Sequence, residues 1–425
     1  MGLIYHSRQK TKQMQLSEEF KSSTRTLMGD ELFSMFIEAL DDEPPVSLRL
    51  NRFKPSAVAD GMKKSNVPWC NDGVYLTERP NFTFDPLFHA GVYYVQEAAS
   101  MFVHHILKQY INEPVAVLDL CAAPGGKSTC TLGALPSGSM LVANEPISKR
   151  AQILNENIIK FGCQDVVVTN NYPKDYRQTA LQFDLILADV PCSGEGMFRK
   201  DAKAIDEWSA LNVRKCRDLQ RSIIEEIWGC LKPGGLLIYS TCTLNVHENE
   251  ENIEWIVGEL GAKVMPVDVR PEWNITGSLN GENSLPVYRF IPGKTQSEGL
   301  FVAVLRKDGE HRSTDFRKKL PAGLRKLKIL GDDKLQHHSM ALSIDPRERE
   351  AYPAVEIDYG MAINYLRHEA IVLHAETPTG ILVLTFKGVP IGFVKNLGSR
   401  ANNLYPAEWR IKSTHVPPYN PIVNV

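Results

Sequence analysis

The stretch that decides the fold is Val115-Ala116-Val117-Leu118-Asp119-Leu120, followed by Cys121-Ala122-Ala123-Pro124-Gly125-Gly126-Lys127-Ser128. The first six residues form a short apolar run, which is typical of a strand that is buried on both faces. Glycine and other small residues then allow a tight turn into a helix, which we expect at about 127–134. A buried strand, a glycine-rich turn and a helix make the first unit of a doubly wound parallel α/β sheet.

The same alternation of strands and helices continues through the region 113–308. Short apolar runs bounded by turn residues predict the strands, and the segments between them have helical spacing. The expected strands are 115–120, 141–145, 166–169, 183–189, 236–241 and 299–305. The expected helices are 127–134, 147–161, 211–231 and 248–260, the third of them closed by Lys232-Pro233-Gly234-Gly235. A short hairpin is expected within 264–295, which is rich in Gly, Pro and Asn.

Two smaller regions flank this sheet. Residues 1–112 have the pattern of an α+β unit, with two short amphipathic helices within 16–40 that are separated at Gly29. An alternating strand follows at 46–50, and helical spacing returns at 95–109. Residues 309–425 are β-rich beyond about 357. The 425 residues are therefore expected to form three regions, 1–112, 113–308 and 309–425.

The charges nearly cancel, because 48 Lys and Arg face 50 Asp and Glu for a net charge of −2. This balance excludes a uniformly basic surface but not a local basic groove. Residues 306–328 hold nine basic and three acidic residues, whereas 248–260 hold five Glu and no Lys or Arg. We expect the Glu cluster at 248–254 to be a solvated helix face rather than a metal site, because it lacks His or Asp partners. No metal is expected.

The sequence also limits where the chain works. No apolar run reaches membrane-spanning length, and the opening residues show no signal-peptide core, so we expect a cytoplasmic protein without a membrane partner. Eight cysteines without a C-x-x-C pair favour free thiols over a disulfide framework or a structural zinc site. Most of these thiols should be small buried residues, but two of them stand at the ends of predicted strands.

The turn at 121–128 admits three kinds of ligand. A Walker A phosphate loop would fit Gly126-Lys127-Ser128, but its first glycine is replaced by Cys121. A dinucleotide fingerprint is absent. An adenosyl ligand needs only a short turn and an acid for its ribose hydroxyls, and Glu145 ends the next strand in the position of such an acid. A plain strand–helix connection is the alternative without a ligand.

Two further strands end in groups that could carry chemistry. The strand 183–189 ends in Asp189, and Val190-Pro191-Cys192-Ser193-Gly194 follows it. The strand 236–241 runs directly into Cys242. Ligands of open α/β sheets bind beyond the carboxyl ends of the strands, so Asp189, Cys192 and Cys242 should converge there with the glycine-rich turn. One such thiol is commonly a core residue; two thiols beside an acid favour catalysis.

These motifs resemble those of RNA (cytosine-5)-methyltransferases of the bacterial 16S rRNA class, in the NOL1/NOP2/Sun (RsmB/NOP) group. The resemblance covers about 27–412, and its carriers are Asp119–Ser128, Asp189–Lys200, Ser240–Thr243, Phe84–Glu97 and Asn402–Trp409. It implies a Rossmann-like class I methyltransferase sheet in 113–308. It also implies an N-terminal RNA-binding α+β unit in 1–112 and a C-terminal RNA-binding region in 309–425, a basic linker followed by a β-rich PUA-like domain.

The resemblance assigns a role to each strand-end residue. DNA cytosine methyltransferases place their nucleophile in the Pro-Cys motif, whereas in the RNA family the nucleophile is the Thr-Cys residue. Cys242 would therefore be the nucleophile, and Cys192 would assist product release. Asp189 would hold the N3 edge of the cytosine near the methyl donor. A thiolate added to C6 makes C5 nucleophilic enough to accept a methyl group, which is the reason such a site needs thiols.

The resemblance also implies S-adenosylmethionine as the cofactor. Glu145 would bind its ribose. The family often has an acid near the adenine, but this chain has Asn171 and Tyr172 there, so Asn171 would take over the adenine contact. The residues that would wrap the cofactor are Cys121, Ala122, Ala123, Pro124, Gly125, Gly126 and Lys127, together with Asp189.

The implied partner is RNA, either 16S rRNA or the small ribosomal subunit, bound by a monomer. Phosphate contacts are expected from Arg199, Lys200 and the basic run 306–328. In the C-terminal region the candidates are Lys387, Lys395, Arg400, Arg410 and Lys412, with Phe393, Tyr405 and Trp409 for stacking, although Trp409 is expected to be core. The alternatives are a tRNA cytosine-5 methyltransferase, a non-catalytic rRNA-binding assembly factor and a P-loop NTPase.

Overall fold

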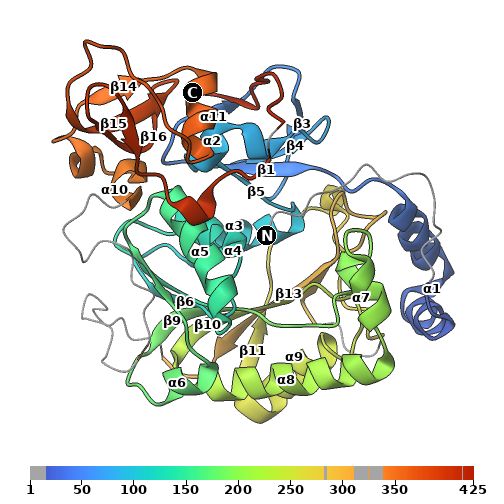
Figure 1. Ribbon diagram of the computed structural model, residues 1–425. Helices are drawn as coiled ribbons and strands as arrows, with labels where there is room; N and C mark the ends of the chain where they lie inside the picture. Colours follow the sequence, from blue (N-terminus) through green and yellow to red (C-terminus); the bar gives the residue numbers. More distant parts are fainter. Residues whose placement is uncertain (1–15, 282–284, 311–323, 325–337, 414) are drawn as a thin grey trace.

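The computed structural model of the protein describes residues 16–281, 285–310, 324, 338–413 and 415–425 (Figure 1). Its centre is an eight-stranded sheet with the strand order β11-β13-β10-β9-β6-β7-β8, and β12 pairs with β13 beside this path. The strands of this sheet are β6 (Ala116–Asp119), β7 (Met140–Asn144), β8 (Val166–Thr169), β9 (Phe183–Asp189), β10 (Leu231–Thr241), β11 (Ala262–Met265), β12 (Val287–Phe290) and β13 (Leu300–Lys307).

The strands β6 to β10 are parallel, and the order reverses at β6, which lies between β7 and β9. Apolar side chains on the two faces of the sheet enter two separate core clusters. One face packs on α3 (Phe102–Tyr110), α4 (Gly126–Ala134) and α5 (Ser148–Phe161), and the other on α6 (Pro173–Arg177), α8 (Ala210–Trp228) and α9 (Glu250–Leu260) (Figure 1). The doubly wound α/β fold expected from the sequence is confirmed.

Some boundaries differ from the expected ones. The long helix α8 ends at Trp228 and β10 begins at Leu231, so Lys232 to Gly235 lie in the strand and do not close the helix. The buried Lys232 ammonium binds the Asp184 carboxylate of β9 at 2.6 Å, which holds this segment in the sheet. Within 264–295, β12 pairs with β13, and two isolated bridges join Thr276 to Arg289 and Pro292 to Thr295.

The N-terminal unit contains α1 (Glu18–Asp41), whose helix is interrupted at Gly29 with φ 74° and ψ 166°, as the expected separation of two helices requires. A second sheet has the order β3-β4-β1-β5. Helical structure after it starts with a 3₁₀ turn at Ala99–Met101 that leads into α3, and not at residue 95, because Tyr93–Val95 form β5 and pair with β1. The strands and the short helix of this unit are β1 (Ser47–Leu50), β2 (Ala57–Val58), β3 (Lys63–Asn66), β4 (Gly73–Leu76), β5 (Tyr93–Val95) and α2 (Pro86–His89).

Strand β1 does not alternate between buried and exposed residues, because α4 covers its second face. Arg49 is only 2 % exposed. Its Nε donates to Gln96 Oε1 at 2.8 Å, and its guanidinium Nη2 donates to Thr129 Oγ1 of α4 at 2.7 Å. The N-terminal sheet is therefore fastened to the helix that follows the glycine-rich turn.

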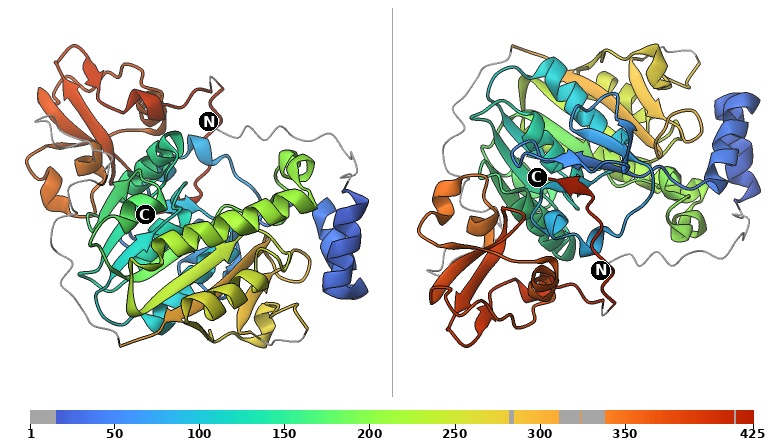
Figure 2. Two further views of the ribbon diagram at one scale, coloured as in Figure 1. Left: turned by 90° about the horizontal axis from the view of Figure 1, so that it is seen from below. Right: turned by 90° about the horizontal axis from the view of Figure 1, so that it is seen from above.

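The C-terminal region forms a four-stranded sheet and then returns to the N-terminal unit. The last strand β18 (Val423–Asn424) pairs with β2, and Figure 2 shows the end of the chain against the N-terminal strands. One apolar cluster contains Leu48 and Phe84 of the N-terminal unit together with Tyr365 and Leu384. The remaining elements are α7 (Ala202–Glu207), α10 (His338–Leu342), α11 (Tyr359–Leu366), β14 (Ala354–Glu356), β15 (Gly380–Phe386), β16 (Val389–Asn396) and β17 (Ala401–Asn403).

Three further expectations from the sequence concern membrane spans, metal sites and the basic run 306–328. Within the described ranges, none of the helices has both the length and the apolar character needed to cross a membrane. The same residues contain no group of three or more His, Cys, Asp or Glu arranged to hold a metal ion. Most of the basic run 306–328 lies outside the described residues.

Candidate active site

The glycine-rich turn follows a buried carboxyl group, that of Asp119. Gly125 has φ 112°, a conformation open mainly to glycine, and α4 starts directly after it. The fully buried Asp119 at the end of β6 accepts a 2.6 Å hydrogen bond from Ser128 Oγ on Oδ2, while Oδ1 has no partner in the described part of the chain. Burial raises the pKa of Asp119 to about 7, against the opposing effect of the Ser128 hydrogen bond.

Glu145 follows β7 and is 1 % exposed. Its Oε1 accepts the backbone N–H of Ile147 at 3.0 Å. Its Oε2 accepts no hydrogen bond from the described residues, and the Arg150 guanidinium is 3.6 Å away. The orientation of this carboxylate is therefore fixed by the chain, while one of its oxygens remains available as an acceptor.

Residues after the next strand complete the same edge of the sheet. Asn171 is buried, and its backbone N–H and C=O both bond to the side chain of Asn144, at 3.1 and 2.9 Å. Tyr172 is 58 % exposed, and Ile147 after the neighbouring strand is 52 % exposed. Ile147 was missed by the sequence reasoning, because a single apolar residue after a strand carries no signal of its own.

The two thiols lie in direct contact. Their Sγ atoms are 3.1 Å apart. Strands β9 and β10 are parallel neighbours in which Asp189 is paired with Ser240, so both strands end at the same edge. The Ser240 hydroxyl donates to Asp189 Oδ1 at 2.7 Å. The structure thus brings together Asp189, Cys192 and Cys242.

The charges around the two thiols are unequal. The Lys127 ammonium lies 2.9 Å from Asp189. Burial lowers the pKa of Lys127, but Asp189 and the Cys242 sulfur raise it by more, so the lysine stays charged. The pKa of Cys192 is raised well above its usual value by the contact with Cys242, by burial and by the carboxylate of Glu248. The cation therefore acts on Cys242, whereas an anion acts on Cys192.

The expectation of a solvated Glu cluster at 248–254 is wrong for two of its members. Glu248 and Glu250 are fully buried. Glu250 forms a buried ion pair with Arg289 of β12 at 2.7 Å. Glu248 faces the Cys192 loop and accepts the backbone N–H of Ser193 at 3.0 Å. Charge density along the chain did not predict this, because partners on distant segments determine which residues of a helix are covered.

Two other expectations about RNA contacts are also wrong. The Arg199 side chain is 6 % exposed and binds Glu298 at 3.1 Å and the carbonyl of Ala39 at 2.9 Å, so it joins α1 to the active-site loop and does not face RNA phosphate. Phe393 and Tyr405 are buried in the C-terminal core. Trp409 is half-buried against the same core. Lys200, 26 % exposed by side chain, lies 3.6 Å from Glu298.

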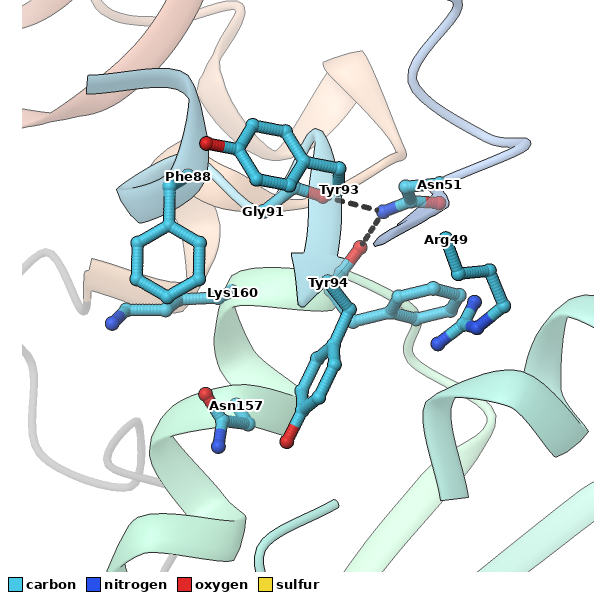
Figure 3. Close-up of a pocket in the computed structure, with 9 residues that line it drawn as sticks. Arg49, Asn51, Phe88, Gly91, Tyr93, Tyr94, Asn157 and Lys160 are labelled. Atoms are coloured by element: carbon cyan, nitrogen blue, oxygen red, sulfur yellow. Dashed lines mark hydrogen bonds between the residues drawn. The ribbon is translucent and has the colours of Figure 1, made fainter. Parts of the chain in front are cut away.

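A small cavity lies between the N-terminal sheet and α5 (Figure 3), and its lining residue Asn157 donates to the Pro124 carbonyl of the glycine-rich turn at 2.8 Å. The Asn51 amide lies across it and donates to the carbonyls of Gly91 and Phe161, at 2.8 and 2.9 Å. It contains none of the residues that the sequence singled out for catalysis. Its lining residues are Arg49, Asn51, Phe88, Gly91, Tyr93, Tyr94, Asn157, Lys160 and Phe161.

The fold and the site are those of a chain whose family models define an S-adenosylmethionine-dependent methyltransferase. The chain matches three family models: 16S rRNA methyltransferase RsmB/F over residues 105–306, the N-terminal domain of 16S rRNA methyltransferase RsmF over 16–98, and the methyltransferase RsmF PUA domain over 352–411. A solved methyltransferase homologue from Pyrococcus horikoshii is similar, with a TM-score of 0.58 and 25% identity over 69% of this chain and 96% of that one.

Two curated relatives show to which family of methyltransferases the chain belongs. The ribosomal RNA small subunit methyltransferase F of Aliivibrio salmonicida (strain LFI1238) is 32% identical over 92% of this chain and 97% of its own length. The protein of the same name from Klebsiella pneumoniae (strain 342) is 28% identical over 92% and 96%. The chain belongs to the RsmB/F family of 16S rRNA methyltransferases.

The residues at the turn fit the cofactor of that family. Two buried carboxylate oxygens, Asp119 Oδ1 and Glu145 Oε2, have no donor among the described residues. S-adenosylmethionine carries an ammonium group and two ribose hydroxyls, which are donors of the kind that such oxygens lack. The exposed rings and methyl groups of Tyr172 and Ile147 offer apolar surface for a base at the same edge.

Proposed function

We propose that the protein transfers a methyl group from S-adenosylmethionine to C5 of a cytosine in 16S rRNA, through a covalent bond between Cys242 and C6. The observation that carries this proposal is the contact of two thiols at 3.1 Å beside the Asp189–Lys127 ion pair. A site for simple methylation of an amine or a hydroxyl would not need two thiols, whereas activation of C5 requires a nucleophile at C6.

Residues of the protein have separate roles in this reaction. Cys242 attacks C6 as a thiolate, which is the nucleophilic form of a cysteine. Asp189 holds the N3 edge of the ring, and a proton shared between its carboxyl group and N3 offsets the negative charge that develops there when the thiolate adds. When bound, the cofactor supplies an electrophilic methyl group, which C5 accepts. Loss of the C5 proton to a base then expels the Cys242 sulfur as the C6–S bond breaks, and Cys192 assists this release.

The cofactor would be held at the edge formed by β6, β7 and β8. The turn Cys121 to Lys127 would wrap it, and Glu145 Oε2 would accept from the ribose hydroxyls. Asn171 would contact the adenine, with Tyr172 beside it. The buried backbone of Asn171 and the exposed ring of Tyr172 support this division.

The RNA would be bound by the flanking regions. A target base must leave its stack before a thiol can reach C6, at a cost of a few kcal/mol that contacts elsewhere must offset. The match of 352–411 to the PUA family model supports RNA binding by the region 309–425, and the N-terminal unit 1–112 would contribute from the other end of the catalytic region 113–308. The five basic residues proposed for phosphate contact are all exposed: Lys387, Lys395, Arg400, Arg410 and Lys412.

The choice of 16S rRNA rests on the printed names of the relatives, and tRNA is the alternative substrate. The test is to incubate the protein with tritium-labelled S-adenosylmethionine and, separately, 16S rRNA, small ribosomal subunits and tRNA. We expect label in 16S rRNA or in the subunit, and bisulfite sequencing should place it on C5 of a cytosine. Label only in tRNA, or on another atom, would contradict the proposal.

A further inference from the structure

The loops that carry Cys192 and Cys242 are joined by hydrogen bonds to glutamate carboxylates, and each loop supplies one of the two glutamates. Glu195 belongs to the loop of Cys192, and its Oε2 accepts the backbone N–H groups of Leu244 and Asn245 in the other loop, at 2.8 and 3.0 Å. Glu248 follows Cys242, and its Oε2 accepts the backbone N–H of Ser193 in the first loop, at 3.0 Å. Each loop is therefore held by a glutamate from the other.

Asn245 connects the two carboxylates. Its Nδ2 lies 3.0 Å from Glu195 Oε1 and 2.9 Å from Glu248 Oε1. An amide nitrogen has two hydrogens to donate, one for each carboxylate. The Asn245 Oδ1 in turn accepts the backbone N–H of Glu248 at 3.0 Å. We call Glu195, Asn245 and Glu248 the loop clamp.

The two carboxyl groups of the clamp have no cationic partner among the described residues. Glu195 is 2 % exposed and Glu248 is fully buried, and neither forms an ion pair within the described ranges. Their other donors are neutral: Trp208 Nε1 at 2.9 Å from Glu195, and Gln220 Nε2 at 2.7 Å from Glu248. Burial raises the pKa of Glu248, and its neighbour Glu195 adds to this effect.

The two thiols depend on the clamp to different degrees. Cys242 directly follows β10, whose last residue, Thr241, is paired with Phe301 of β13. Cys192 lies three residues beyond the end of β9, and the hydrogen bond from Ser193 to Glu248 holds the loop next to it. Loosening the clamp would therefore displace Cys192 and leave Cys242 in place.

We propose that Glu195, Asn245 and Glu248 are positioning residues that hold Cys192 against Cys242 for the release of methylated RNA. This inference rests on the proposed function, because it assumes a covalent adduct on Cys242. It assigns to the Glu-rich run after the Thr-Cys motif a part in the reaction. Loss of the clamp should slow release more than attack, so that enzyme accumulates on RNA.

The test uses the full-length protein with the variants Glu248→Gln and Asn245→Asp. In Glu248→Gln one carboxylate oxygen becomes an NH₂ group that faces the donors of Asn245 and Gln220. In Asn245→Asp a third carboxylate replaces the amide that joins the other two. For both we expect kcat to fall about 10- to 100-fold, with KM for RNA within about twofold of the wild type. Covalent adduct should accumulate on a denaturing gel.

The adduct is counted per molecule of enzyme that binds S-adenosylmethionine, so that misfolded protein does not enter the result. Glu259→Gln is the matched control, because Glu259 is an exposed residue near the end of α9, the helix that follows Glu248, and it should behave as the wild type. Wild-type turnover without adduct in both clamp variants would overturn the inference. So would a loss of turnover with no adduct per donor-binding molecule, because that is the result of a purely structural role.

A Cys192→Ala sample on the same gel separates this result from the proposed function. If Cys192→Ala traps RNA and the clamp variants do not, the inference about the clamp is wrong and the proposed function stands. If Cys192→Ala itself forms no adduct with any of the RNA substrates, the proposed covalent mechanism is wrong, and the clamp inference is overturned with it.

Discussion

The Sγ atoms of Cys192 and Cys242 lie 3.1 Å apart, although 50 residues separate them in the chain. The reason is the parallel register of β9 and β10, in which Asp189 is paired with Ser240 and both strands end at one edge of the sheet. Since ligands of doubly wound sheets bind beyond this edge, the contact puts both thiols within reach of one base.

Removal of the nucleophile should abolish the reaction without affecting the cofactor site. For Cys242→Ala we expect no methyl transfer to 16S rRNA, while the affinity for S-adenosylmethionine measured by titration calorimetry stays within about twofold of the wild type. Because the thiol lies at the end of β10 and not in the glycine-rich turn, donor binding should not depend on it. Full activity in this variant would disprove the covalent mechanism.

Removal of the release thiol should trap the intermediate. For Cys192→Ala we expect the enzyme to remain bound to RNA as a slowly migrating band on a denaturing gel, because the C6–S bond is made but not broken. The double variant Cys192→Ala/Cys242→Ala is the control and should give no band. A band of equal strength in the double variant would mean that another residue makes the bond.

The ribose contact can be measured without turnover. Glu145→Gln keeps the shape of the buried side chain but removes its charge, so we expect the Kd for S-adenosylmethionine to rise about 10- to 100-fold. The exposed Glu113 lies on the same chain away from this edge, and Glu113→Gln should leave the Kd unchanged. An unchanged Kd in Glu145→Gln would remove Glu145 from the cofactor site.

The buried ion pair between Glu250 and Arg289 should matter for stability. Both side chains are fully buried, with 2.7 Å between Arg289 Nη2 and Glu250 Oε2. Glu250→Ala leaves the Arg289 charge buried without its partner, so we expect the free energy of unfolding to fall by about 3–5 kcal/mol. Urea denaturation followed by circular dichroism would measure this. The half-exposed Glu251 serves as the control, and Glu251→Ala should cost less than about 1 kcal/mol.

His89 should make stability depend on pH. It is buried, with its Nε2 donating to Thr83 O at 2.8 Å and its Nδ1 accepting from Tyr405 Oη at 3.3 Å. Burial, with Lys160 adding to it, lowers the pKa of His89 from 6.5 to about 3. Between these values the unfolded chain binds the proton and the folded chain does not, so this stability is present above pH 6.5 and is lost as the pH falls.

The comparison with His89→Gln isolates this contribution. The difference in free energy of unfolding between the wild type and the variant should shrink by about 2 kcal/mol from pH 7 to pH 5, since each pH unit below 6.5 costs about 1.4 kcal/mol. A difference that does not change with pH would show that the pKa of His89 is the same in the folded and in the unfolded protein.

Local patterns in the sequence determined the catalytic sheet and the order of its motifs. The apolar run before Asp119, the turn through Gly125 and the strands before Asp189 and Cys242 all lie where they were expected. These features could be predicted because a buried parallel strand and a glycine-rich turn impose their composition on neighbouring residues. The parallel direction of the strands follows from the same alternation, since parallel strands need crossover helices.

Which polar residues are buried, and what they contact, depends on the packing of segments that are distant in the chain. Arg199 was expected to face RNA and instead binds Glu298 and the end of α1, and Glu248 was expected in solvent and instead holds the loop of Cys192. A charge is buried only where distant segments supply hydrogen-bond donors or acceptors for it. The residues next to it in the sequence do not show which partners those segments supply. The positions of the two thiols at strand ends could therefore be predicted from the sequence. The hydrogen bonds that hold their loops together depend on the packing of remote segments.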